Sequence, residues 1–384
     1  MRTRAVTAVA ATLALGLAAG PLAAPALASP AGVTRPTTAG PDADALTAAL
    51  AGLPDDDATA ALVRVGGTDG SWRGTAGVHD LESGSAADPN GLFRAGSTTK
   101  VVTAAVVLQL VAEGKADLGR PVRDYLPDLI PAAYETVTVR QLLNHTSGIP
   151  SADFPGNTFE EVYAHRFDLH TPQEMLASAT AKEPTFIPGT QQQYLNINYT
   201  VLALLVERLT GHSYEQEAAR RIFEPLGMRH TYFPGTDPTI NGPHNRGYQS
   251  VPHADGTTEL RDVTVWGATD AWAAGDMIST TVDLERFLKA LFRGQVVPQR
   301  QLREMFTVPA GIPGATMSAG LQRYVAQDGT ELWLKSGGRW GYNTIIAATR
   351  DLSRTLVYSV NSTDAKGQGM NPVAERIVRA TFTM

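Results

Sequence analysis

The chain is strand-like near both ends and helical in its middle, and this order limits the folds open to it more than any other feature. Six segments have the composition and bounding turns of strands: 60–65, 71–78, 321–325, 331–335, 342–348 and 355–361. Helical patterns lie outside them, at 42–53 and after Pro372. Because the layers of one domain share a core, strands from both ends are expected to meet in one sheet. The sequence therefore predicts an α/β fold of the α+β type, with an antiparallel sheet of about five strands, flanking N- and C-terminal helices and a helical insertion domain.

The middle of the chain carries the helical signals. Thr171-Pro172-Gln173-Glu174 is a capping box with proline at the first helical position, and a further helix at 199–209 is closed by Gly211. We therefore predict that residues 41–115 and 262–384 form a discontinuous sheet domain and that 116–261 form the insertion.

The first residues have the features of a secretory signal peptide, predicted at 1–28. Arg2 and Arg4 precede an apolar stretch, and an A-x-A cleavage site ends at Ala28. Residues 29–40, rich in Pro, Thr, Ala and Gly, are predicted to be a flexible linker. The expectation is a secreted, extracytoplasmic monomer without a stable membrane anchor.

Composition excludes several kinds of chemistry. The chain has 38 acidic and 32 basic residues, so no excess of positive charge is available for nucleic acid. It has no cysteine, which excludes a thiol nucleophile and disulfide bonds. The eight histidines form no H-E-x-x-H pattern, and neither a metal nor another cofactor is expected. No G-x-S-x-G elbow occurs, so His145 is expected to be a turn residue rather than a catalytic base.

Ser97-Thr98-Thr99-Lys100 is the only place where a serine precedes a lysine by three residues. It opens a long apolar helix, so Ser97 would lie beside free backbone N–H groups and Lys100 one turn further on the same face. Only six of the 32 basic residues are lysine, and a buried lysine, unlike arginine, can lose its proton near neutral pH. The pattern favours a nucleophile and its base, the alternative being a capping serine with an incidental lysine.

Two later motifs strengthen the catalytic interpretation. Tyr194-Leu195-Asn196 precedes a helix and offers a phenol, which nearby cations can drive toward phenolate, and an amide for a lysine or a substrate carbonyl. Lys335-Ser336-Gly337-Gly338 ends a predicted strand, where the lysine and hydroxyl can bind a carboxylate and the glycines allow close backbone approach.

Together and in this order, the three motifs resemble those of the serine penicillin-recognising family. The resemblance runs from roughly residue 45 to the end of the chain, and includes further segments at 141–149, 188–190 and 274–284. It is closest to the soluble, secreted D-alanyl-D-alanine carboxypeptidases related to class C β-lactamases. It implies a β-lactamase/transpeptidase-like fold.

The resemblance also implies roles for individual residues. Ser97 would be the acylating nucleophile and Lys100 its proton acceptor, with Tyr194 relaying a proton and Asn196 orienting Lys100 and the substrate amide. The choice of base between Lys100 and Tyr194 is left open. Backbone N–H groups of Ser97 and Gly338 would form the oxyanion hole. The substrate would be bound by the final motif, Lys335, Ser336, Gly337 and Gly338.

The function implied is a D-alanyl-D-alanine carboxypeptidase that shortens peptidoglycan stem peptides and is acylated by penicillins. Two departures from the family pattern weaken the case for a peptide: Leu195 stands where serine is frequent, and Gly338 lacks a hydroxyl. The alternatives are a class C-like β-lactamase, a serine esterase or D-amino-acid amidase acting on a small acyl substrate, and a non-enzymatic receptor for β-lactams or muropeptides.

Overall fold

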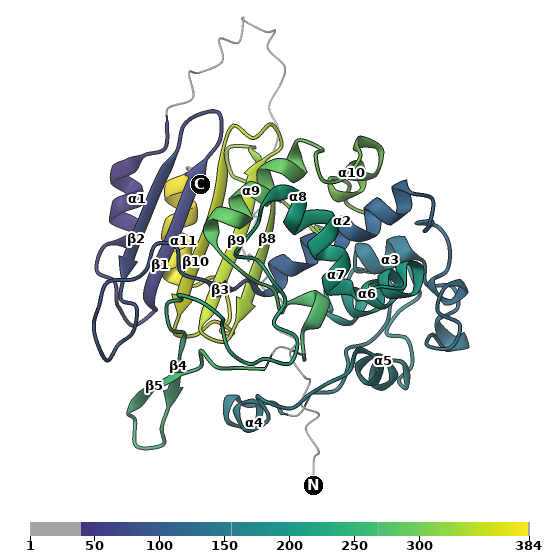
Figure 1. Ribbon diagram of the computed structural model, residues 1–384, viewed down its shortest axis with the longest axis horizontal. Helices are drawn as coiled ribbons and strands as arrows, with labels where there is room; N and C mark the ends of the chain where they lie inside the picture. Colours follow the sequence, from purple (N-terminus) through teal and green to yellow (C-terminus); the bar gives the residue numbers. More distant parts are fainter. Residues whose placement is uncertain (1–39, 155, 268, 383–384) are drawn as a thin grey trace, which may run out of the picture.

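The computed structural model describes residues 40–154, 156–267 and 269–382, so the predicted signal peptide and nearly all of the linker lie outside the described residues. The main sheet has six antiparallel strands in the order β2-β1-β10-β9-β8-β7 (Figure 1), where about five were expected. The strands are β1 (Ala58–Gly66), β2 (Trp72–Gly77), β7 (Gln322–Val325), β8 (Glu331–Arg339), β9 (Tyr342–Thr349) and β10 (Thr355–Ser362).

The pairing of β1 with β10 joins the two ends of the chain, as the sequence predicts. Ala61 lies opposite Val360, and Val65 opposite Leu356. Nearly every residue of both strands is buried, because helices cover both faces at the centre of the sheet.

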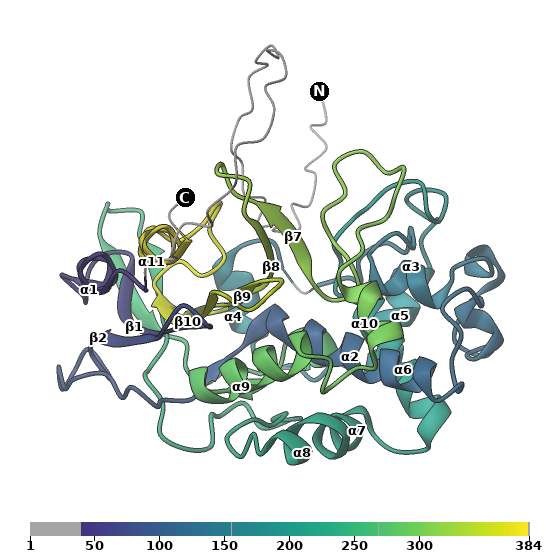
Figure 2. The same ribbon diagram turned by 90° about the horizontal axis from the view of Figure 1, so that it is seen from above.

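Three helices cover the sheet. α1 (Ala43–Leu50) and α11 (Pro372–Phe382) lie on one face, and α9 (Thr281–Phe292) lies on the other (Figure 2). Each helix is amphipathic, so its apolar side faces the strands. Leu46 and Ile377, for example, share one apolar cluster with the strands β1, β8, β9 and β10.

The segment between the strands is mainly helical, as predicted. Its helices are α2 (Thr99–Ala112), α3 (Val139–Leu143), α4 (Phe159–Ala164), α5 (Pro172–Thr180), α6 (Ile197–Thr210), α7 (Tyr214–Ala218) and α8 (Glu224–Leu226), and α10 (Gln299–Met305) follows α9. The capping box at Thr171 and Glu174 is present, and Gly211 ends α6 at a positive φ of 73°. The exact domain boundaries stay a prediction.

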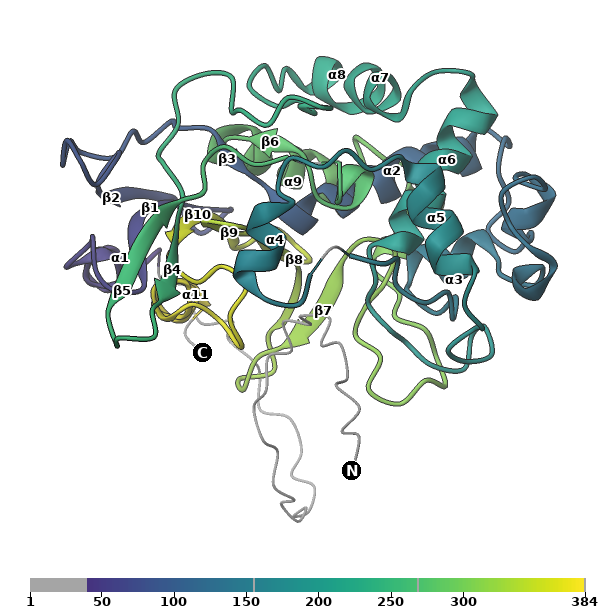
Figure 3. The ribbon, with the colours of Figure 1, turned by 90° about the horizontal axis from the view of Figure 1, so that it is seen from below.

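One hairpin of the structure was not predicted from the sequence. β4 (Tyr248–Pro252) pairs with β5 (Thr258–Asp262) and projects beyond the end of the main sheet (Figures 1 and 3). It lies in the stretch predicted to be a helical insertion, because strands this short carry little periodic signal. A second small sheet pairs β3 (Phe93–Arg94) with β6 (Ile278–Ser279), and so brings the segment before β6 close to the start of α2.

The helices α2 and α6 form the core on which the site is built. In α2, every residue from Thr99 to Leu108 is buried, and in α6 every residue from Ile197 to Val206. A helix buried on all sides is held by packing rather than by an amphipathic stripe. None of the helices in the described part of the chain is long and apolar enough to span a membrane.

We expect Leu108→Ala to lower the free energy of unfolding by about 2–5 kcal/mol, because Leu108 is fully buried in α2 and its truncation leaves a cavity. Leu169→Ala is the matched control: Leu169 is 64% exposed, so the same truncation should change stability by less than about 0.5 kcal/mol. Urea unfolding of both variants measures the difference, and equal losses would contradict the assigned core.

Candidate active site

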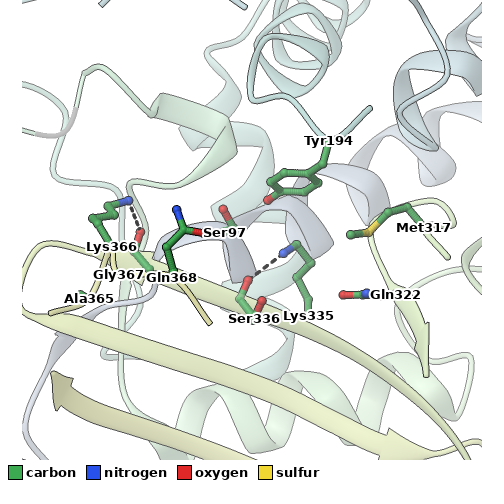
Figure 4. Close-up of a pocket in the computed structure, with 11 residues that line it drawn as sticks. Ser97, Tyr194, Met317, Gln322, Lys335, Ser336, Ala365, Lys366, Gly367 and Gln368 are labelled. Atoms are coloured by element: carbon green, nitrogen blue, oxygen red, sulfur yellow. Dashed lines mark hydrogen bonds between the residues drawn. The ribbon is translucent and has the colours of Figure 1, made fainter. Parts of the chain in front are cut away.

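Ser97 lies where a turn of 3-10 helix, Gly96–Thr98, runs directly into α2. Gly96 has a positive φ of 54°, which a residue with a side chain rarely adopts. The Ser97 side chain reaches a pocket that Tyr194 and Lys335 also line (Figure 4). The remaining wall comes from Met317 before β7 and Gln322 at its start, from Ser336 and Gly338 of β8, and from the loop between β10 and α11.

The strand β8 touches the turn before Ser97 through backbone alone. A Cβ on Gly337 would lie 2.1 Å from Ala95 O, and a Cβ on Gly96 would lie 2.6 Å from Gly338 N. Thr344 of β9 donates a hydrogen bond to the same Ala95 carbonyl (2.8 Å). The glycines are therefore required by this close approach, which brings the backbone of Gly338 next to Ser97.

Lys100 is fully buried one turn after Ser97, and its amine contacts three separate segments. Nζ donates hydrogen bonds to Asn196 Oδ1 at the start of α6 (2.7 Å) and to Ala274 O (2.7 Å). It lies 3.1 Å from Ser97 Oγ. Burial, and then the charges of Lys335 and Lys366, hold the pKa of Lys100 well below its usual value.

The phenol of Tyr194 lies between two lysines. Its ring centroid is 4.8 Å from Lys100 Nζ and 4.8 Å from Lys335 Nζ, within the range of cation–π attraction. Burial raises the pKa of Tyr194, and the nearby Ser97 hydroxyl only partly opposes this shift. Nearby cations were expected to favour a phenolate, but the pKa of Tyr194 is raised instead, because burial disfavours the charged phenolate.

Two supporting groups were not assigned to the site from the sequence. Ala274 contributes only its backbone carbonyl to Lys100, which no side-chain pattern reveals. His145, expected as a turn residue, has a positive φ of 62° and is buried with its ring 4.6 Å from that of Tyr194. Its Nδ1 accepts a hydrogen bond from Leu195 N (3.4 Å), so it supports the Tyr194 segment from behind. The segments containing both residues were marked only by the family resemblance.

Lys335 and Ser336 lie on a stretch of β8 with a free edge. β7 pairs with β8 only as far as Leu334, so no strand in the described part of the chain pairs with the backbone from Lys335 onward on that side. Lys335 is 5% exposed and donates a hydrogen bond to Ser336 O (2.7 Å), and its burial lowers its pKa to about 7. The structure brings together all eight residues predicted from the sequence, in the three segments around Ser97, Tyr194 and Lys335.

A serine at the start of a buried helix, with a buried lysine one turn on and an antiparallel sheet beside it, defines a serine hydrolase of the β-lactamase and penicillin-binding class. The chain belongs to the Beta-lactamase family, which its residues 37–379 match. The family resemblance and the fold expected from the sequence are thus confirmed.

Among solved structures, a D-stereospecific amidohydrolase from Streptomyces sp. is similar over 89% of this chain and 99% of its own, with 32% identity and a TM-score of 0.77. D-amino acid amidase from Ochrobactrum anthropi SV3 is similar over 88% and 98%, with 26% identity and a TM-score of 0.72. Penicillin-binding protein 4* of Bacillus subtilis is 28% identical over 71% of this chain. The chain spans 61% of that relative's length.

We expect Gly337→Ala to reduce the Ser97-dependent acylation rate at least about 100-fold, because the new Cβ would push β8 away from Ala95. Gly338→Ala is the matched control on the same strand, since its Cβ would meet nothing closer than 3.2 Å. Stopped-flow acylation by a chromogenic β-lactam or ester measures both. Equal rates in the two variants would contradict the close approach.

Proposed function

We propose that Ser97 is the acylating nucleophile and that Lys100, as a neutral amine, is its base. A neutral amine has two N–H donors and one lone pair. Asn196 Oδ1 and Ala274 O accept the two donors, which leaves the lone pair for the Ser97 hydroxyl 3.1 Å away. This arrangement is the observation that carries the proposal, and it favours Lys100 over Tyr194 as base.

The proposed reaction proceeds through an acyl-enzyme. The Ser97 proton passes to Lys100 Nζ as Oγ attacks the carbonyl carbon, and the backbone N–H groups of Ser97 and Gly338 stabilise the oxyanion. The C–N bond then breaks, and Tyr194, a neutral phenol because its pKa is raised, gives a proton to the leaving amine and is reprotonated through Lys100. Water enters where the amine left and releases the acid by the reverse proton transfers.

The preferred substrate is a peptide that ends in a carboxylate, and the activity a D-alanyl-D-alanine carboxypeptidase acting on peptidoglycan stem peptides. Lys335 and the Ser336 hydroxyl would bind the terminal carboxylate on the leaving side of the reacting carbonyl. Similarity to penicillin-binding protein 4* supports acylation by penicillins. Such a substrate is consistent with the secretion that the first 28 residues predict.

A second candidate is hydrolysis of D-amino-acid amides. It is favoured by the similarity to a D-stereospecific amidohydrolase and a D-amino acid amidase over nearly their whole lengths. Both candidates share Ser97 and Lys100 and cleave an amide. They differ at Lys335, because an amide substrate has no terminal carboxylate to bind.

We expect benzylpenicillin to acylate Ser97, and Lys100→Met to slow this acylation about 10²–10⁴-fold because the base is lost. Intact mass over time measures the adduct, and Ser97→Ala should form none. Lys115→Met, at an exposed lysine that pairs with Glu113, is the control and should behave as the wild type. Antibiotic hydrolysis without a lasting adduct would indicate a β-lactamase instead. Ester cleavage alone would indicate an esterase.

Binding of the terminal carboxylate should weaken as the pH rises through about 7. The pKa of Lys335 is lowered to about 7, so its positive charge is present below that pH and lost above it. The ratio of kcat/KM for a peptide ending in D-Ala-D-Ala to kcat/KM for its C-terminal amide should fall between pH 6 and 8.5. Lys335→Arg should remove this trend, since arginine stays protonated. A ratio independent of pH in the wild type would contradict the role of Lys335.

A further inference from the structure

The lysines of this chain fall into two groups. Three lie away from the pocket, and each is paired with a carboxylate: Lys115 with Glu113 (3.0 Å), Lys182 with Asp153 (2.6 Å) and Lys289 with Glu285 (2.6 Å). The other three are Lys100, Lys335 and Lys366, and none of them forms an ion pair among the described residues. No acidic residue is found among the described residues that line the pocket. Lys100 is proposed to be a neutral amine and needs no counter-ion, so in the described part of the chain Lys335 and Lys366 are the two unpaired cationic groups that line the pocket, where they can attract an anion.

Lys366 is the member of this group that the proposed reaction does not use. It lies in the loop between β10 and α11, and its Nζ donates a hydrogen bond to Gly338 O (2.9 Å). The same loop is already held to β9 because Asn343 Nδ2 donates to Ala365 O (3.0 Å). Asp270 is the carboxylate whose negative charge raises the pKa of Lys366. Both of its oxygens accept hydrogen bonds from Arg339. Desolvation and the charge of Arg339 nevertheless lower the pKa of Lys366 to about 8, so its amine is mostly protonated at neutral pH and has free donors beside the pocket.

Two lysines bracket the reacting serine along β8. Lys335 is anchored on Ser336 O and Lys366 on Gly338 O, two residues further along the strand. Carbonyls two residues apart on a strand point to the same side, roughly 7 Å from one another. Figure 4 shows the two side chains on opposite sides of Ser97. If Lys335 binds the leaving group, Lys366 lies beside the acyl part of the substrate.

We propose that Lys366 is a specificity-determining residue that binds an anionic group on the acyl side of the substrate. The inference rests on the proposed function, because that function sets which side is the leaving side. The substrate class is then a peptide with two anionic groups, one at its C-terminus and one in its acyl portion.

The positive charge of Lys366 would disfavour the binding of a D-amino-acid amide. A D-amino-acid amide carries a free α-ammonium next to its reacting carbonyl, and Lys366 would repel it. This charge would distinguish the chain from amidases that act on free amino-acid amides, although it resembles a D-amino acid amidase in fold.

A pair of p-nitrophenyl esters isolates the acyl side, because their leaving group carries no carboxylate. One is the mono-p-nitrophenyl ester of glutarate, and the other replaces its free carboxylate with a carboxamide. We expect the wild type to favour the carboxylate ester about 10-fold in kcat/KM. Lys366→Met should bring the ratio close to one, and Lys366→Arg should keep the preference. Lys115→Met changes the net charge equally and should also keep the wild-type preference.

Three outcomes of the ester measurements would contradict a role for Lys366 in binding the acyl-side anion. A wild-type ratio near one, a ratio unchanged in Lys366→Met, or equal losses of both esters in that variant would overturn the proposal. If the esters behave as expected but no D-alanine is released from peptides ending in D-Ala-D-Ala, the carboxypeptidase assignment fails and the role of Lys366 stands.

A binding measurement covers the case in which neither ester is turned over. Calorimetric titration of the Ser97→Ala protein with glutarate and with glutaramate compares a dianion with a monoanion of the same length. We expect glutarate to bind about 10-fold more tightly, and Lys366→Met to remove the difference. Equal affinities in the Ser97→Ala protein would overturn the proposal.

Discussion

The burial of the Lys100 amine is the constraint on which the rest of the site depends. An ammonium enclosed in a protein interior without a carboxylate is unfavourable, so the pKa of Lys100 lies well below its usual value, and we propose that the neutral amine acts as a base. Its two donors are satisfied by Asn196 and by the Ala274 carbonyl, from segments about 96 and 174 residues away in sequence. The enclosed helices α2 and α6 supply the dry environment, and Ser97 stands at the edge where that environment meets solvent.

The second constraint is the short distance between the backbone of β8 and the turn before Ser97. β8 approaches the turn before Ser97 so closely that side chains are excluded at Gly96 and Gly337. We propose that the reacting carbonyl of a substrate lies between the start of α2 and the part of β8 beyond Leu334, which pairs with no further strand on that side among the described residues. Lys335 of β8 and Lys366 of the loop after β10 are anchored on two carbonyls of this strand and lie to either side of Ser97 (Figure 4). Position along β8 thus underlies both the chemistry and the selectivity that we propose.

Much of this could be predicted from the sequence, and the failures have physical causes. The Ser97 and Lys100 pair, the six strands and the Thr171 cap were predictable because each is encoded locally, by spacing or composition. The β4–β5 hairpin was missed because it is too short to show a period. The Ala274 carbonyl carries no side-chain signal. The direction of the Tyr194 pKa shift and the grouping of Lys366 with Lys335 depend on burial and tertiary contact, which spacing along the chain does not determine.

The protonation state of Lys100 is the central claim, and it can be measured directly. The chain has only six lysines, so the side-chain signals of protein labelled with ¹³C- and ¹⁵N-lysine can be followed by NMR as the pH is raised. The Lys100 signal is assigned by its absence from the Lys100→Met protein. Our account predicts that it titrates well below the usual lysine range and shows a neutral amine at neutral pH. A Lys100 signal that stays in the ammonium form until about pH 10 would contradict the account.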